Sequence, residues 1–277
     1  MDRATSTGFC GAKTLKVGCV MKHFWEEPII SGINGSGAIF FSHCNMKCCF
    51  CQNYQISHEG IGEEITVKRL AGIFKKLEEE GAHNINLVTG SHYTEEIIAA
   101  LKIYRPRIPI VWNSSGYEEV KTIKRLAPYV DIFVPDLKYF GSDIALKYSS
   151  AKDYFDKTTA AIKQMRKNQP EDIIENGLMK KGLIIRHMPL PTHVEDSKKV
   201  LDWIAENLGN KTFISLMCQY FPCYKSSSPI DRPLLPLEYK IVLSHANKLG
   251  FENGFVQEES SASAKYVPDF KNKLDLY

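Results

Sequence analysis

The sequence contains no long apolar run and no excess of charge of one sign. Its 277 residues carry 35 Lys and Arg against 32 Asp and Glu, and the net charge of +3 offers no electrostatic basis for nucleic-acid binding. No run approaches the roughly 20 apolar residues of a membrane span. Residues 1–5 lack the apolar core of a signal peptide, so we expect a cytoplasmic protein. A composition of 44% apolar and 24% charged residues excludes disorder for most of the chain.

A second pair of closely spaced metal-ligating residues is also missing. Four of the eight cysteines fall within residues 44–51, and no further Cys-x-x-Cys or His-x-x-x-His pair occurs. Without a secretion signal, clustered thiols are expected in a reducing compartment, where they indicate metal ligands rather than disulfides. The remaining cysteines are Cys10, Cys19, Cys218 and Cys223.

Strand and helix signals alternate from about residue 38 to the end of the chain. Short β-branched apolar runs predict strands, and apolar stripes with i, i+3, i+4, i+7 spacing predict helices. The expected strands are 38–41, 84–89, 108–112, 130–134, 182–187, 211–216 and a short one at 254–257. The expected helices are 66–80, 94–104, 118–126, 153–167, 194–208 and 237–249, with further helical material near Ile144.

This alternation predicts a mostly parallel sheet covered by helices, in an α/β fold. About six βα units fall short of the eight of a closed barrel, so we expect an open, partial (β/α)6 TIM-like barrel with its site at the carboxyl ends of the strands. Residues 1–35 carry little regular pattern and are expected to form an N-terminal extension, with the barrel domain in 36–277. The likeliest long loops are 168–177 and 224–236.

Three cysteines with the spacing Cys44-x3-Cys48-x2-Cys51 follow the first expected strand. Thiolates are soft donors, so a soft metal centre is the natural occupant of such a loop. Structural zinc normally takes four ligands, whereas three ligands suit a cubane iron–sulfur cluster that keeps one iron open. The alternatives are buried free cysteines, or zinc completed by His43 or Cys49.

With an aromatic residue before the third cysteine, Cys44-x3-Cys48-x-Phe50-Cys51 resembles the signature of the radical S-adenosylmethionine (SAM) superfamily. Further segments, spread over nearly the whole chain, resemble the branch of proteins similar to pyruvate formate-lyase activating enzyme. They are Trp25-Glu26-Glu27-Pro28, Gly35-Ser36-Gly37, Val88-Thr89-Gly90-Ser91-His92-Tyr93, Asn113-Ser114-Ser115-Gly116-Tyr117, Pro135-Asp136-Leu137-Lys138-Tyr139, Arg186-His187 and Gly254-Phe255-Val256-Gln257.

The resemblance implies a partial barrel of the radical SAM type and an oxygen-sensitive enzyme. Cys44, Cys48 and Cys51 would hold one [4Fe–4S] cluster whose open iron binds the amino and carboxylate groups of SAM. An electron from the cluster would cleave a C–S bond, and the 5′-deoxyadenosyl radical would abstract a hydrogen atom, here from a backbone glycine of a glycyl radical enzyme. The implied electron donor is a flavodoxin or a ferredoxin.

Two other functions remain open at this stage. One is a radical SAM enzyme that modifies a small molecule or peptide directly. The other is a thiol-rich metal-binding or redox module that never cleaves SAM.

The resemblance also implies contacts to the cofactors. Phe50 and Gln52 lie in the cysteine loop, and Thr89-Gly90-Ser91 ends the second expected strand, where relatives bind the SAM amino group. The alternative for this turn is an ordinary strand-to-helix connection capped by Thr94.

Asn113 and Ser115 follow the third expected strand, where polar groups can meet the ribose or methionine part of SAM. The alternative for this segment is a capped turn before the next helix.

Asp136 and Lys138 follow the fourth expected strand, and alternate residues of an extended segment point the same way, into the barrel. By resemblance, Lys138 is suited to the SAM carboxylate, and Asp136 with Asn113 would bind a monovalent cation. The alternative is a structural ion pair between Asp136 and Lys138.

Arg186 ends the fifth expected strand and is the other candidate for the carboxylate, because its planar fork matches that group. Met188 would point with Arg186 and contact the adenine, whereas His187 would point away as a structural residue. No protein acid or base is predicted to be catalytic, since the reactive group belongs to the cofactor.

Overall fold

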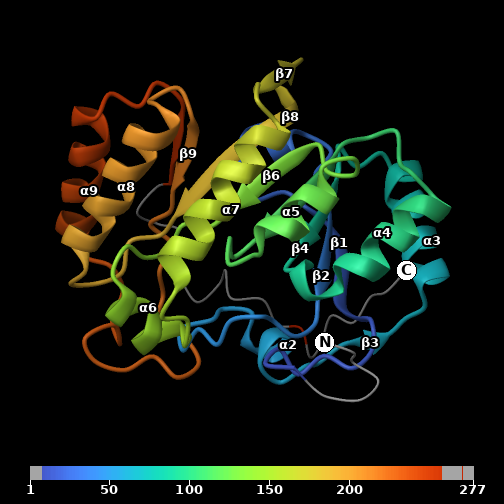
Figure 1. Cartoon of the computed structure of the whole chain (residues 1–277), viewed down its shortest axis with the longest axis horizontal. Coiled ribbons are helices and arrows are strands. Elements are labelled where there is room, and N and C mark those ends of the chain that lie inside the picture. The colour runs from blue at the N-terminus through green and yellow to red at the C-terminus, as the bar shows by residue number, and fades with distance from the viewer. Residues whose placement is uncertain (1–7, 258–269, 271–277) are drawn as a thin grey trace.

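Six parallel strands form the middle of one curved sheet (Figure 1). The computed structural model describes residues 8–257 and Phe270. The sheet order is β10-β9-β8-β6-β5-β4-β2-β1-β3, a path that does not close on itself. The parallel strands are β2 (Ser36–Phe41), β4 (Ile85–Val88), β5 (Ile110–Ser114), β6 (Ile132–Pro135), β8 (Leu178–His187) and β9 (Phe213–Leu216), with β10 (Gly254–Val256) parallel to β9 at one edge. The expected open, partial (β/α)6 barrel is confirmed.

An antiparallel strand that the sequence analysis did not predict lies near the other edge. β1 (Lys16–His23) pairs with β2, with Val17 opposite Phe41, and the short β3 (Glu63–Glu64) pairs with β1. A register irregularity after Val17, at Gly18, interrupts the alternation by which a strand is recognised. Regular structure therefore begins earlier than expected, while the domain division at residue 35 stays a prediction.

A second unexpected strand lies inside the predicted loop at 168–177. β7 (Ile173–Glu175) forms an antiparallel hairpin with β8, and all its side chains are exposed. An exposed strand shows no alternation of apolar and polar residues, which is why the loop prediction was wrong here.

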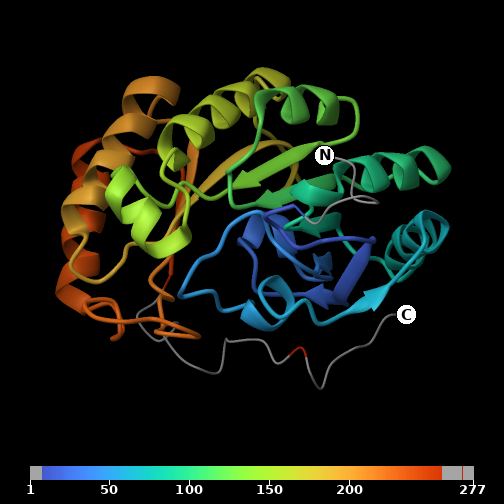
Figure 2. The ribbon, with the colours of Figure 1, turned by 60° about the horizontal axis from the view of Figure 1, so that its bottom comes forward.

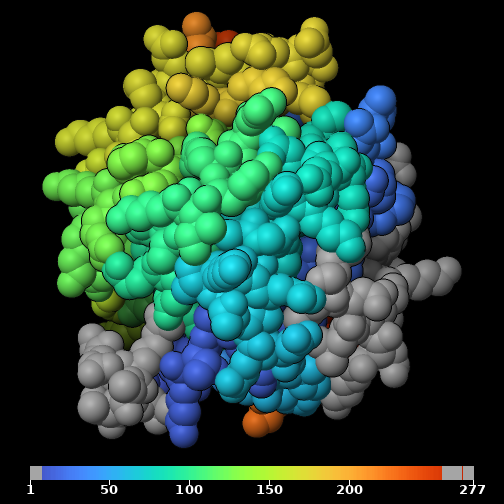
Figure 3. Space-filling view, turned by 90° about the vertical axis from the view of Figure 1, so that its right-hand side faces the viewer, coloured from blue at the N-terminus to red at the C-terminus, as the bar shows by residue number. Residues whose placement is uncertain are grey.

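The longer helices cover the outer face of the sheet and follow the strands in the expected order, whereas Ile30 of α1 packs on the inner face. Figure 2 shows them along an arc around the strands, and Figure 3 shows α3 and α4 as a continuous surface over one end of the sheet. In residues 8–257, no helix has both the length and the apolar character needed to cross a membrane. The helices are α1 (Pro28–Ser31), α2 (Tyr54–Ser57), α3 (Val67–Glu79), η1 (Ser91–Tyr93, a 3₁₀ turn), α4 (Thr94–Ile103), α5 (Val120–Leu126), α6 (Ser142–Ser149), α7 (Tyr154–Asn168), α8 (Val194–Leu208) and α9 (Pro236–Lys248).

Alternate side chains of each strand point to opposite faces of the sheet, so the sheet lies between two apolar layers. The layer beneath the helices includes Ile39, Phe41, Leu87, Trp112 and Phe133, all fully buried. The opposite, inner face of the sheet carries Ala38, Phe40, Val88, Val111, Ile132, Val134 and Ile184, and Phe270 packs there against Phe40 with ring centroids 5.7 Å apart. Polar side chains on this inner face therefore need a specific explanation.

Gly116, in the turn after β5, brings this turn close to the end of β6. Its backbone is left-handed, with φ of +73°, and a Cβ at this position would lie 2.3 Å from the carbonyl oxygen of Asp136. Only glycine permits so close an approach.

We predict that Gly116→Ala destabilises the fold clearly more than Gly177→Ala. Gly177 has nearly the same backbone, with φ of +77°, but nothing lies within 4 Å of an added Cβ. Both variants should lose about 1–2 kcal/mol through left-handed strain, and only Gly116→Ala adds the clash with the backbone. Urea unfolding measures both losses, and equal losses would show that the close approach is unimportant.

The carboxyl group of Glu118 joins the ends of β4 and β5. Its residue is only 4% exposed, and its oxygens accept hydrogen bonds from Ser91 Oγ at 2.7 Å, Trp112 Nε1 at 2.8 Å and Ser114 Oγ at 2.9 Å. Burial raises the pKa of this carboxyl by more than the three hydrogen bonds lower it. One buried group thus fixes the two turns relative to each other.

We predict that the wild-type chain loses stability relative to Glu118→Gln as the pH rises above about 4.5, the ordinary pKa of a Glu carboxyl. The folded carboxyl still binds its proton at pH values where the unfolded one has released it, so its contribution to the free energy of unfolding falls with increasing pH. Urea unfolding of both proteins from acid to neutral pH measures the difference. If the wild type instead gained stability relative to Glu118→Gln over this pH range, the folded state would prefer the ionised carboxylate.

Candidate cluster and cofactor site

The three motif cysteines lie on the loop that joins β2 to α2. This loop is anchored on both sides, because His43 N donates to Ile56 O at 2.8 Å and Cys49 N donates to Tyr148 O at 2.8 Å. His43 has a left-handed φ of 67°, which turns the chain away from β2. The loop is thereby held at the carboxyl edge of the sheet, between α2 and α6.

Each motif thiol already has a polar neighbour. Ser149 Oγ donates to Cys48 Sγ at 3.0 Å, Ser57 Oγ lies 3.2 Å from Cys51 Sγ, and the Met46 amide donates to Cys44 Sγ at 3.4 Å. These contacts fix where the sulfur atoms sit before any metal is bound.

Burial and mutual repulsion keep the free thiols protonated. Burial, with the charge of Cys48 as the next cause, raises the pKa of Cys44 to about 12 and that of Cys51 to about 11. Burial also raises the pKa of Cys48. The three thiols are therefore close enough to interact electrostatically, and a metal centre has to displace their protons on binding.

The chemistry of the donor set, three soft thiols on one loop, fits an iron–sulfur cluster. In a cubane the thiolates bind separate irons, so three soft donors spread along one loop suit it.

Lys138 places a positive charge beside this loop. Its Nζ lies 2.5 Å from Asp136 Oδ2, so the expected alternative of an ion pair between these residues is present. Burial lowers the pKa of Lys138. The charges of Asp136 and Cys48 are the next largest causes and raise this pKa, and the net shift is upward. The charge of Lys138 in turn lowers the pKa of all three motif thiols. Lys138 therefore stays charged beside the cysteines.

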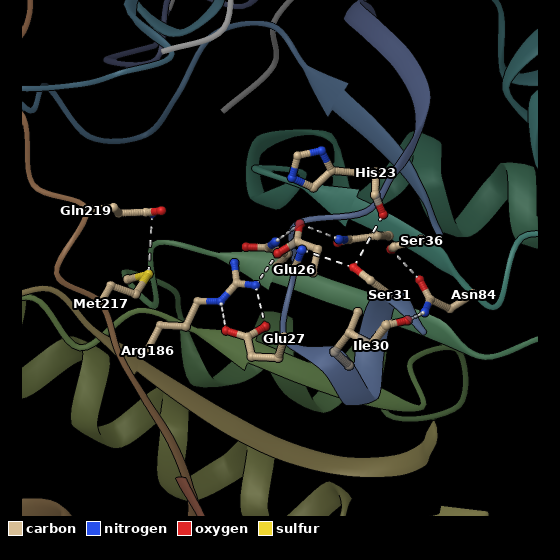
Figure 4. A network of polar contacts seen from close by, with 12 residues as sticks. His23, Glu26, Glu27, Ile30, Ser31, Ser36, Asn84, Arg186, Met217 and Gln219 are labelled. Atoms are coloured by element: carbon tan, nitrogen blue, oxygen red, sulfur yellow. Dashed lines mark hydrogen bonds and ion pairs between the residues drawn. The ribbon is translucent and has the colours of Figure 1, made fainter. Parts of the chain in front are cut away.

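Arg186 forms the centre of a buried ion cluster inside the barrel (Figure 4). Its Nε donates to Glu27 Oε1 at 2.8 Å and its Nη2 to Glu27 Oε2 at 2.6 Å, and Nη2 also contacts Glu26. Glu26 Oε1 accepts from Asn86 Nδ2 at 2.9 Å and from Asn113 Nδ2 at 3.4 Å. Burial raises the pKa of Glu27, but Arg186 lowers it and the net shift is downward.

The sequence analysis did not assign a role to Glu26 or Glu27. They belong to a segment noted only for its resemblance, Trp25-Glu26-Glu27-Pro28, and two acids before a short helix are usually solvated. The partner, Arg186, lies 159 residues from Glu27. The only signal was the coincidence that both segments resemble the same branch.

Several other predicted contacts already have partners within the protein. Phe50 is 5% exposed and packs edge-on against Tyr220 at 5.7 Å. Gln52 Nε2 donates to the Gln219 carbonyl at 3.2 Å. Ser91 donates its hydroxyl to Glu118, as described above. Their roles toward a cofactor stay predictions.

The turn after β4 is held by its backbone, because Thr89 N donates to Asn113 O at 2.8 Å and Tyr93 N donates to Gly90 O at 2.8 Å. Thr89 has a left-handed φ of 60°, and a Cβ on Gly90 would lie 2.7 Å from Ile97 Cδ1. Further along this edge, the hydroxyl of Ser115 is buried without a hydrogen-bond partner among the described residues. It is therefore available to a ligand.

At the end of β8, Arg186 and Met188 are half-buried and His187 is buried. His187 Nδ1 lies 2.7 Å from the Leu137 carbonyl, whereas its Nε2 has no hydrogen-bond partner among the described residues. The expected role of Met188 stays a prediction.

Known proteins are similar to this chain in sequence and in fold. The uncharacterized protein MJ0674 of Methanocaldococcus jannaschii is 31% identical over 266 residues, which cover 91% of this chain and 73% of that protein. Streptococcus suis SuiB bound to S-adenosylmethionine is similar in structure, with a TM-score of 0.52, 13% identity, and coverage of 83% of this chain and 52% of SuiB.

Native anSMEcpe with bound AdoMet is also similar, with a TM-score of 0.51, 16% identity, and coverage of 78% of this chain and 61% of that one. The chain thus spans between half and two thirds of the length of these solved structures. At such low identity, the likeness shows a common fold. A sequence model described as the Radical SAM superfamily matches residues 38–204, well over half of the chain. The chain therefore belongs to the radical SAM superfamily of enzymes.

Proposed function

We propose that this chain cleaves SAM reductively at a [4Fe–4S] cluster bound by Cys44, Cys48 and Cys51, and removes a hydrogen atom from a polypeptide. The observation that carries the proposal is the placement of three thiols on one anchored loop, at the carboxyl edge of the sheet and beside the charge of Lys138. When bound, the cluster supplies one electron to the sulfonium of SAM, and the 5′-deoxyadenosyl radical that results abstracts hydrogen.

Lys138 is the better of the two cations for the SAM carboxylate. Arg186 already pairs with two carboxylates, those of Glu26 and Glu27, whereas among the described residues Lys138 pairs with Asp136 alone. A third carboxylate beside Arg186 would add a like charge in a buried place. Arg186 therefore positions the glutamates, and Lys138 receives the anion.

Neutral polar groups at the same edge suit the rest of SAM. The unpartnered hydroxyl of Ser115 suits the ribose, and backbone groups of Thr89 and Gly90 suit the amino group. The amide oxygen of Asn113, with Asp136, suits a monovalent cation. Gln52 and Met188 complete the proposed contacts.

The inner face of the sheet suits a reaction that must exclude water. Its apolar residues, among them Phe40, Val88, Val111 and Val134, do not hold water by hydrogen bonds. Exclusion of water would limit hydrolysis and proton leakage at the site.

For the substrate we propose a backbone glycine of a glycyl radical enzyme, with a flavodoxin or ferredoxin as electron donor in an oxygen-poor cytoplasm. The support is the resemblance of segments along the chain to activating enzymes. Direct modification of a peptide is the second candidate, because similar folds are SuiB bound to the precursor peptide SuiA and anSMEcpe bound to the Cp18Cys peptide.

We predict that Cys48→Ala abolishes cluster binding and that the neighbouring Cys49→Ala does not. Cys48 is a proposed ligand, while Cys49 is not and packs against the core. The two proteins and the wild type are reconstituted anaerobically with iron and sulfide, then given SAM and dithionite. Iron content and 5′-deoxyadenosine should fall to background only in Cys48→Ala. SAM cleavage by Cys48→Ala, or equal loss in both variants, would refute the ligand assignment.

The two candidate substrates predict different stoichiometry. Activation of a glycyl radical enzyme should consume about one SAM per partner chain and leave a persistent protein radical, detected by electron paramagnetic resonance. Direct modification of a peptide should give many turnovers and a changed peptide mass. SAM cleavage without a protein radical on any glycyl radical enzyme tested, together with peptide turnover, would favour the second candidate.

A further inference from the structure

Five charged side chains gather near the carboxyl ends of β6 and β8, inside the barrel. Three are carboxylates, from Glu26, Glu27 and Asp136, and two are cations, from Arg186 and Lys138. Asp136 and Lys138 neutralise each other, and Arg186 serves both glutamates. The group therefore carries one negative charge more than its cations neutralise.

Of the two glutamates, Glu26 has the fewer contacts with the positive charge of Arg186. Glu27 accepts hydrogen bonds from two nitrogens of Arg186, Nε and Nη2, while Glu26 contacts only Nη2. The other oxygen of Glu26 accepts from two neutral amides, those of Asn86 and Asn113. The side chain of Glu26 is 9% exposed, and a buried carboxylate that shares its cation is costly in free energy.

His23 does not remove this excess charge. Figure 4 shows its ring on the side of Glu26 away from Glu27. Within residues 8–257, Arg186 is the partner recorded for Glu26 in an ion pair, and His23 forms none with either glutamate.

The amide of Asn86 gives a second, independent observation. Asn86 is fully buried, and its Nδ2 donates to Glu26 Oε1 at 2.9 Å. This contact orients the amide, because its oxygen would be repelled by the carboxylate. The Oδ1 atom of Asn86 is then left buried with no hydrogen-bond partner among the described residues. An unfilled acceptor thus lies beside the under-compensated carboxylate.

One kind of group satisfies both atoms, a hydrogen-bond donor that carries positive charge. A water or a hydroxyl would fill the acceptor on Asn86 but would leave the excess charge. The ammonium of a lysine and the guanidinium of an arginine are such donors.

We propose that Glu26 and Asn86 form a binding site for a cationic side chain of the polypeptide substrate within the barrel, next to Asn113, which also contacts Glu26. The inference rests on the proposed function insofar as a polypeptide is the substrate. The group that Glu26 and Asn86 would bind is a primary ammonium or a guanidinium.

The probes are two short peptides, acetyl-Gly-Lys-amide and acetyl-Gly-norleucine-amide, which differ only in the ammonium group. Binding to the reconstituted enzyme with SAM is measured by anaerobic calorimetry, without reductant. The wild type should bind the lysine peptide about ten- to hundredfold more tightly than the norleucine peptide, as expected for hydrogen bonds to charged groups.

Glu26→Gln should remove this preference while keeping the shape of the side chain. The matched control is Glu238→Gln, since Glu238 also pairs with an arginine, Arg232, but lies at α9. The control should keep the full preference. Asn86→Ala provides a second route and should weaken the lysine peptide alone, by about tenfold. Thermal melts of the variants establish that they are folded.

Equal binding of the two peptides to the wild type would overturn the proposal, as would a preference that survives in both Glu26→Gln and Asn86→Ala. Cleavage of SAM by the wild type with dithionite and no peptide is assayed on the same preparation. A lysine preference without SAM cleavage would refute the proposed function and keep the cation site. SAM cleavage without the lysine preference would refute the cation site and would leave the proposed function standing.

Discussion

An apolar interior cannot hold a charge without a partner, and this constraint organises the inside of the barrel. Strands of an open parallel sheet place alternate side chains on an inner face made mostly of Val, Ile and Phe. Each charge admitted to that face must be paired at short range. The paired bonds in turn tie the segment before α1 to β8, far apart in the sequence, and so help to hold the barrel in its curved, open form.

The same constraint applies to the buried thiols of the cysteine loop. Burial keeps its thiols protonated, so the loop carries no uncompensated negative charge when the cluster is absent. Lys138 brings a positive charge to the loop, and this charge favours the thiolates that a cluster requires. Asp136 balances the charge of Lys138.

The sequence predicted the parts of the molecule that depend on local patterns. The strand-and-helix alternation predicted the open six-unit barrel, because this signal is carried by neighbouring residues. The cysteine spacing is an equally local signal, and the ligand role it indicates stays a prediction. Strand β1 was missed because Gly18 breaks its alternation, and β7 because it is exposed. The Glu118 and Glu26 contacts were missed for another reason. They depend on which side chains meet in space: Glu118 contacts Ser91 across 27 residues, and Glu26 contacts Arg186 across 160 residues.

In the proposed function, the charges inside the barrel distinguish the position of SAM from that of the polypeptide substrate. Lys138, balanced by Asp136, leaves the end near the cysteines favourable to an anion such as the SAM carboxylate. Glu26, which shares its cation with Glu27, leaves the region beside Arg186 favourable to a cation. Because like charges in a poorly solvated space repel strongly, neither ligand is favoured at the position of the other. A cofactor and a substrate of opposite local charge would therefore each be guided to one end of the same barrel, with the bond to be broken between them.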